Sequence, residues 1–269
     1  MDFTSKYLGK DDPVTEGVIR ELHKVTVKGV RGGQADPGNY RKVQNYIVNS
    51  RTREVIYTPP VPLEVPHLMR EFAEWLNKAE DMSPILVAGI AQFQFVHVHP
   101  FIDGNGRTAR LLSTLILYKT GYDFKRLFTI SEYYDKDRPA YYKAIQSVRE
   151  NNMDMTAWLE YFVDGLKSQM AEIYEKGKQI IIADNTVKLL EDLKLNIRQE
   201  KIIRYLVINE QIDNTLCQKI CNSIKRTVTR DLTGLVEKDI LKKIGEKKGT
   251  YYILSSKVIE KIRDIKGHP

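Results

Sequence analysis

Twelve consecutive residues, from His99 to Arg110 (HPFIDGNGRTAR), combine side chains and backbone that suit phosphate chemistry. Glycines let backbone N–H groups approach an anion, and the N-terminal end of a following helix adds positive potential. Arg107 and Arg110 are three residues apart, so both fall on one helix face and can reach phosphate oxygens. The stretch therefore predicts an anion-binding turn between two helices.

Other residues of this turn suit the transfer of a group from a phosphate compound. Asp103 supplies a hard carboxylate oxygen of the kind that Mg²⁺ prefers. His99 has the side chain best able to accept a proton near neutral pH. Backbone amides from Gly104 to Gly106, together with the Asn105 side chain, are expected to form the anion cradle. The competing interpretation is a helix connection in which glycines only turn the chain and arginines face solvent.

The flanking sequence predicts the elements that position the turn. An apolar run from Ile85 to Val96 leads into it, and a second run from Leu111 to Tyr118 leads out. Residues 14–29 have helical periodicity, and two extended runs predict a β-hairpin near residues 43–58. Helices are expected from Pro66 to about Leu190. The predicted fold class is therefore mainly α with one small hairpin in this part of the chain.

The twelve-residue string resembles the signature of the Fic domain, HPFx[DN]GNGRxxR, at every fixed position. The likeness extends over roughly residues 16–166. Residues 37–48 and 57–76 are similar to the β-hairpin "flap" of that family and the helix after it, and residues 132–148 are similar to its C-terminal helices. The resemblance implies the helical Fic fold with a hairpin flap.

The resemblance also implies an activity, the transfer of AMP from ATP to a Ser, Thr or Tyr hydroxyl of a target protein with release of pyrophosphate. It assigns proton acceptance to His99 and the binding of Mg²⁺, or Mn²⁺, to Asp103. It assigns the β/γ end of ATP to Arg107 and the γ-phosphate to Arg110. Gly106 is intact, which favours adenylylation over the reaction of the related Doc-type kinases, while phosphocholine transfer stays open.

Four residues outside the turn complete the nucleotide site that the resemblance implies. Tyr141 and Tyr142 match a tyrosine pair that contacts the adenosine part of the nucleotide in the family, and tyrosine can stack on a base. Ile47 and Val48 would pair with an extended target segment or cover the nucleotide. Core aromatic packing and ordinary strand packing are the competing interpretations. His97, two residues before the expected base, is interpreted as structural.

The sequence departs from the family in one respect. Many Fic proteins carry an inhibitory helix with the pattern [ST]xxxE[GN], whose glutamate pairs with the second arginine of the turn. Here only Glu16 and Glu150 precede Gly or Asn, and the residues four before them are Asp12 and Gln146. We therefore expect the inhibitory segment to be degenerate, lost upstream or supplied by a partner, and the protein to be active without activation.

Basic residues are concentrated in the C-terminal part. Residues 191–269 hold 17 Lys and Arg against 11 Asp and Glu, whereas residues 1–190 hold 25 against 24. Three helices followed by two strands around GEKKG resemble a winged helix-turn-helix domain, which favours DNA as a partner. Protein docking is the alternative. The residues expected to face DNA are Lys225, Arg226, Thr229, Arg230, Lys242, Lys243, Lys247 and Lys248.

These observations predict a catalytic domain at residues 1–167, a linking helix at residues 168–190 and a winged helix-turn-helix domain at residues 191–269. No membrane segment or signal-peptide core is present, so a cytoplasmic protein is expected. Cys217 and Cys221, one helical turn apart with no histidine nearby, predict reduced, packed thiols.

Two functions compete for this sequence. The first is the adenylyltransferase, with ATP, a target protein and a second copy of the chain as expected partners. The second is a DNA-binding regulator that uses the Fic-like domain as a nucleotide sensor. A sensor needs a phosphate cradle but no proton acceptor, so His99 favours the enzyme.

Overall fold

The computed structural model describes residue 9 and residues 12–29, 36–49, 52–79, 81–122 and 130–267. It divides into two compact units, Met1–Ala171 and Glu172–Pro269. The boundary falls inside one long helix, α8 (Thr156–Lys188). The segment expected to link two domains, residues 168–190, is therefore largely the continuation of a helix that begins in the first unit.

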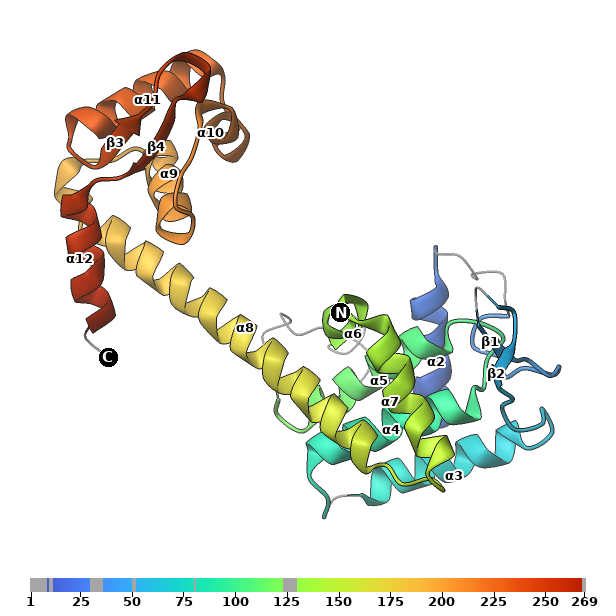
Figure 1. Cartoon of the computed structure of the whole chain (residues 1–269). Helices are drawn as coiled ribbons and strands as arrows, with labels where there is room; N and C mark the ends of the chain where they lie inside the picture. Colours follow the sequence, from blue (N-terminus) through green and yellow to red (C-terminus); the bar gives the residue numbers. More distant parts are fainter. Residues whose placement is uncertain are drawn as a thin grey trace. The chain divides into compact units, whose positions relative to one another are not determined.

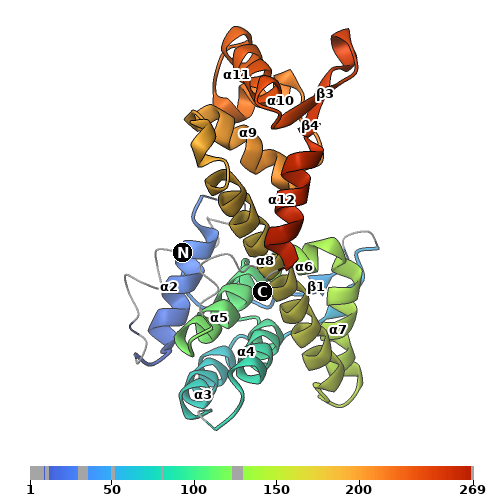
Figure 2. The same ribbon diagram turned by 90° about the vertical axis from the view of Figure 1, so that its left-hand side faces the viewer.

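Helices build the first unit around a central antiparallel pair (Figure 1). The pair consists of α4 (Pro84–Val98) and α5 (Asn105–Lys119), and Figure 2 shows it in the middle of the unit. The other helices are α2 (Glu16–Val27), α3 (Val65–Lys78), α6 (Ile130–Lys136), α7 (Arg138–Glu150) and the start of α8. Helix α2 packs on α5, and α3 packs on α4.

The sequence of α4 explains why this helix lies at the centre. It is apolar on nearly all sides, as expected of a helix that is buried all round. Phe93, Phe95 and Phe101 are fully buried, and Trp158 and Phe162 of α8 join them in the core. The two apolar runs of the sequence thus form two buried helices joined by the polar turn, as expected.

The flap is a short antiparallel hairpin of β1 (Ile47–Val48) and β2 (Val55–Tyr57). Ile47 pairs with Tyr57, and Val48 pairs with Val55. The hairpin lies where the sequence predicts it, but its strands are shorter than the extended runs. Prolines at positions 59, 60 and 62 follow β2 directly and cannot donate hydrogen bonds to a strand pair.

The second unit contains three helices, a hairpin and a final helix. These elements are α9 (Ile197–Ile208), α10 (Asn214–Cys221), α11 (Lys225–Glu237), β3 (Leu241–Ile244), β4 (Tyr251–Leu254) and α12 (Ser256–Gly267), with 3₁₀ turns at Glu191–Leu193 and Lys247–Gly249. Strands β3 and β4 are antiparallel. Helix α12 was not expected from the sequence, and it buries Val258 and Ile262 against the unit's core.

Both cysteines are free and buried in the core of the second unit. Burial raises the pKa of the Cys217 thiol to about 12, so the thiol stays protonated at neutral pH. The interpretation of the pair as reduced, packed thiols is confirmed. Within the described part of the chain, no helix combines the length and apolar character needed to cross a membrane.

Candidate active site

The turn between α4 and α5 is held in an unusual backbone conformation. His99 ends α4 in the left-handed region (φ 51°), and Gly104 precedes α5 in the same region (φ 79°). A Cβ at position 104 would lie 2.6 Å from Val27 Cγ1 of α2. Glycine is therefore required at position 104 both by the backbone angle and by the close approach of α2.

Asn105 closes this turn from within. Its Oδ1 accepts a hydrogen bond from the Phe101 N–H (2.9 Å), and its Nδ2 donates to the Phe101 carbonyl (2.8 Å). The Asn105 side chain is buried, and the ring of Phe101 lies beneath the turn in the core. The structure thus uses this side chain to hold the turn, while its expected contact with an anion stays a prediction.

His23 of α2 supports the turn from the other side. Its Nδ1 accepts a hydrogen bond from the Gly38 N–H (2.9 Å), so its Nε2 carries the proton and donates to the Asp103 carbonyl (2.9 Å). The ring stacks on Phe101 with centroids 3.7 Å apart. Burial lowers the pKa of His23 and keeps the ring neutral, as this pairing requires.

Arg41 is a second supporting residue that sequence analysis missed. Its side chain is 2% exposed, and its Nε donates to the His99 carbonyl (2.9 Å). The same guanidinium donates to the Pro60 carbonyl, at the end of the flap. Arg41 thus connects the His99 backbone to the base of the flap, and its partners are carbonyl groups that no sequence pattern reveals.

A cavity of about 540 Å³ opens beside the turn. This volume suits a small-molecule ligand. Seven of the predicted site residues line it: Ile47, Val48, His99, Gly106, Arg110, Tyr141 and Tyr142. Asp103, Gly104, Asn105 and Arg107 are not among its lining residues. The wall is completed by Asn49, Ile56, Val96, Ile145, Gln146 and Arg149, which sequence analysis did not select.

The His99 ring is arranged to accept a proton. Its Nδ1 lies 3.2 Å from the Val96 carbonyl. A carbonyl oxygen can only accept, so Nδ1 carries the ring proton and Nε2 keeps a free lone pair. Burial lowers the pKa of His99 to about 4, with smaller contributions from the charges of Arg41 and Arg149. The ring is therefore neutral at pH 7, and an anionic ligand beside it would raise its proton affinity.

The two arginines of the turn have different partners. Arg110 Nε donates to the Ser131 hydroxyl (2.9 Å), and no carboxylate pairs with Arg110 within the described ranges. Arg107 Nη2 lies 3.6 Å from Asp103 Oδ2. Arg110 thus presents an uncompensated positive charge at the cavity, as expected of a phosphate-binding group.

Asp103 already interacts with the start of α5, and its Oδ1 accepts a hydrogen bond from the Gly104 N–H (2.6 Å). The side chain is half exposed. The described residues contain no cluster of three or more His, Cys, Asp or Glu that could enclose a metal ion. One accessible carboxylate fits Mg²⁺, which is often bound by one or two carboxylates together with water and phosphate oxygens.

A clamp of three side chains attaches the flap to the helices. The Arg149 guanidinium of α7 lies over the Tyr57 ring, 3.5 Å from its centroid. The Tyr57 hydroxyl donates to the His97 carbonyl (2.9 Å) and lies 3.0 Å from His97 Nδ1. Burial lowers the pKa of His97 to about 4, so the ring is neutral. His97 thus has the structural position that was expected, and Tyr57 and Arg149 are residues that sequence analysis missed.

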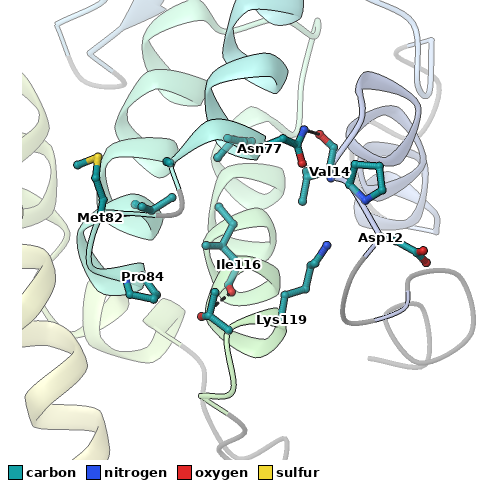
Figure 3. Close-up of a pocket in the computed structure, with 12 residues that line it drawn as sticks. Asp12, Val14, Asn77, Met82, Pro84, Ile116 and Lys119 are labelled. Carbon is teal, nitrogen blue, oxygen red and sulfur yellow. Dashed lines mark hydrogen bonds between the residues drawn. The ribbon is translucent and has the colours of Figure 1, made fainter.

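A second hollow, of about 480 Å³, lies at the other end of α4 and α5 (Figure 3). Val14, Asn77, Pro84, Ile116 and Lys119 are among the residues that line it. Asn77 closes one side by accepting a hydrogen bond from the Val14 N–H and donating to the Val14 carbonyl. None of the predicted site residues lines this hollow. The candidate active site is therefore the cavity beside His99.

The part of the chain that contains the turn is similar to known proteins. Residues 13–117 match the Fic/DOC family. Over 131 residues the chain is 36% identical to "Protein adenylyltransferase Fic" of Drosophila grimshawi, and equally to that of Drosophila ananassae. Each match covers 45% of this chain and 25% or 24% of the relative. The chain thus spans about a quarter of the length of the curated relatives it matches.

The fold also has a counterpart among solved structures. The crystal structure of a Fic family protein from Desulfovibrio desulfuricans G20 matches with a TM-score of 0.56 and 20% sequence identity. The match covers 95% of this chain and 72% of that one. The turn from His99 to Arg110 lies within residues 13–117, the part of the chain that matches the Fic/DOC family.

Proposed function

We propose that this protein is an adenylyltransferase that moves AMP from ATP to a hydroxyl group of a target protein and releases pyrophosphate. The observation that carries the proposal is the neutral His99 ring, with Nε2 free, in one cavity wall with Gly106 and Arg110. A proton acceptor beside an anion site is what transfer needs and what nucleotide sensing alone does not need. The names of the matched relatives support the same reaction.

In the proposed reaction, His99 Nε2 takes the proton of the target hydroxyl as its oxygen attacks the α-phosphorus of ATP. A bond forms between that oxygen and phosphorus, and the bond between the α-phosphorus and pyrophosphate breaks. The proton on His99 is then lost to solvent, which restores the neutral ring. General base catalysis of this kind contributes about 10²- to 10⁴-fold to a rate.

The phosphates of ATP would lie against the start of α5. Arg110, which has no carboxylate partner within the described ranges, would hold the γ-phosphate, and Arg107 the β/γ end. Backbone N–H groups from Gly104 to Gly106 add the positive potential of a helix N-terminus. Asp103 would hold Mg²⁺ or Mn²⁺, which when bound offsets negative charge on the phosphates.

The nucleoside of ATP would lie between α7 and the flap. Tyr142 is 62% exposed and offers its ring for stacking, whereas Tyr141 is buried and stacks on Tyr134 with centroids 4.3 Å apart. We therefore assign base stacking to Tyr142 and a supporting position to Tyr141. Ile47 and Val48 line the cavity from the flap and would cover the nucleotide or pair with the target segment.

We also infer that residues 191–269 form a winged helix-turn-helix domain. Three helices followed by an antiparallel hairpin support this inference. The short turn of three residues between α10 and α11, with Asn222 in the left-handed region (φ 47°), is typical of a helix-turn-helix. Helix α12 follows the hairpin and is additional to the three helices and two strands of that domain.

Labelling with two forms of ATP tests the proposed reaction. The protein is incubated in a cell lysate with Mg²⁺ and with ATP labelled at either the α- or the γ-phosphate. We expect covalent protein labelling from the α-label only, and its loss in His99→Ala while that variant still binds ATP. Labelling only from the γ-label would show a kinase. ATP binding without transfer under all conditions would favour a nucleotide sensor.

A further inference from the structure

Helix α11 carries a basic and polar stripe along its exposed side. Arg226, Thr229, Arg230 and Thr233 are exposed, and each lies three or four residues from two others of the set. These spacings bring side chains onto one helix face. On the opposite side, the helix buries Val228, Leu232 and Leu235 in the core of the second unit, so α11 presents the stripe to the outside.

Asp231 is the acidic residue that lies within this stretch of the sequence, but in the structure it is buried and is not part of the exposed stripe. Asp231 is 4% exposed, and its Oδ2 lies 2.6 Å from Arg198 Nε. Its Oδ1 accepts a hydrogen bond from Asn196 Nδ2 (3.0 Å). The charge of Asp231 is therefore neutralised inside the unit. The next acid on α11, Glu237, lies about 10 Å along the helix beyond Arg230 and four residues beyond Thr233.

The hairpin of β3 and β4 adds lysine side chains to the basic residues of α11. Lys242 and Lys243 on β3 and Lys247 in the turn are exposed. Gly245 makes the turn tight, because its φ is 75° and a Cβ there would lie 2.5 Å from the Gly249 carbonyl. Among the described residues, no acidic side chain pairs with these three lysines or with the two arginines of the stripe. All five charges are therefore available to an external anion.

We propose that the second unit binds duplex DNA, with the α11 stripe in the major groove and the hairpin lysines on the phosphate backbone. The major groove admits an α-helix, and arginine is the commonest side chain in specific contacts, through guanine O6 and N7. Cations at the hairpin would fix the position of the helix on the duplex without reading sequence. This binding goes beyond adenylyl transfer and requires no residue of the His99 cavity.

A titration of the full chain tests this proposal. The probe is a fluorescent random-sequence duplex of about 30 base pairs, roughly three turns of DNA. We expect binding at about 50 mM salt that weakens as salt rises, with a log–log slope of about −0.9 per neutralised phosphate. Sequencing of the bound fraction should show enriched sequences. No binding at this salt concentration overturns the proposal and leaves protein docking as the use of this surface.

Variants separate the two kinds of contact. Arg226→Ala and Arg230→Ala should each weaken binding to the enriched sequences about tenfold and reduce the preference for them. Lys247→Ala should weaken binding to all sequences alike and reduce the salt slope by about one. Circular dichroism and thermal melting check that each variant is folded, since all three side chains are exposed.

Two control variants complete the test. Lys261→Ala removes the same charge from the exposed side of α12, away from α11 (Figure 1), and should change affinity less than about twofold. An equal loss in Lys261→Ala and Arg226→Ala would mean that only net charge attracts DNA, which contradicts the proposal. His99→Ala should bind DNA normally whether or not adenylyl transfer is the reaction, so the two proposals fail separately.

Discussion

At the scale of single residues, the chemistry of the site depends on which atoms are already paired. His99 uses Nδ1 for the Val96 carbonyl, which leaves the lone pair of Nε2 free. Asn105 uses its amide for the backbone of Phe101. Arg110 has a hydroxyl partner but no carboxylate partner in the described part of the chain, so no glutamate there holds it in an inhibited state.

The first prediction concerns Asp103. Adenylyl transfer should require Mg²⁺ or Mn²⁺ and should be lost in Asp103→Ala, because this is the only carboxylate of the turn. The thermal midpoint should change little, since the side chain is half exposed. The measurements are α-label transfer with and without EDTA and a thermal melt. Full activity in EDTA together with full activity of Asp103→Ala would remove the metal from the mechanism.

At the scale of elements, the turn and the flap are each fixed by contacts with other helices. Helix α2 supports the turn through His23 and through the close approach of Val27 to Gly104. Helices α4 and α7 hold the flap through His97 and Arg149, with Tyr57 between them. The positions of both depend on packing between segments far apart in the chain.

A matched pair of glycine substitutions separates the structural from the chemical role of the turn. Gly104→Ala should destabilise the fold by about 1–2 kcal/mol or more, because residue 104 is left-handed and a Cβ meets Val27. Gly106→Ala should fold normally, since its Cβ would lie at an ordinary 3.5 Å from Arg110 Nη1. It should still lose transfer, because the methyl group occupies the cavity wall where phosphate approaches. Urea unfolding and α-label transfer measure the two effects, and equal stability loss in both variants would contradict this division.

The clamp formed by Tyr57, His97 and Arg149 is expected to determine how firmly the flap is held. Tyr57→Ala removes both the stacking with Arg149 and the hydrogen bond to His97, so amide exchange in β1 and β2 should rise and the KM for ATP should increase. Tyr57→Phe keeps the ring and loses only the hydroxyl, so its effect should be smaller. Hydrogen exchange followed by mass spectrometry measures the flap directly. Unchanged exchange in Tyr57→Ala would mean that other contacts hold the hairpin.

At the scale of the whole molecule, three histidines in the first unit make stability depend on pH. Burial lowers the pKa of His23, and lowers that of His97 and of His99 to about 4. Between the ordinary histidine pKa of about 6.5 and the lowered values, the unfolded chain binds more protons than the folded one. The free energy of unfolding should therefore decrease as pH falls from about 6.5 toward about 4.

Urea unfolding at a series of pH values measures this effect. His97→Gln removes one of the three groups and should reduce the slope of the free energy of unfolding against pH in this range. The many carboxylates titrate mainly at lower pH. The difference in slope between this variant and the unaltered protein therefore reports the contribution of His97. A slope equal to that of the unaltered protein would show that His97 is not held neutral by burial.

Features determined by residues close together in the sequence could be predicted from it. The spacing from His99 to Arg110 indicated the turn, the apolar runs indicated two buried helices, and the two extended runs near residues 43–58 indicated the hairpin. Each of these depends on neighbours within about one helical turn or one strand. Seven of the selected residues line one cavity because the turn, α7 and the flap meet there.

Only the tertiary structure decided what holds these parts together. His23 pairs with a backbone carbonyl 80 residues away, Arg41 with one 58 residues away, and Tyr57 with His97 across 40 residues. Backbone partners are present at every position, so no residue pattern marks them. Burial also keeps the His99 ring neutral and takes Asp231 out of the exposed surface of α11. The sequence by itself determined which groups can do the chemistry, whereas folding determined which of them are buried, paired or free.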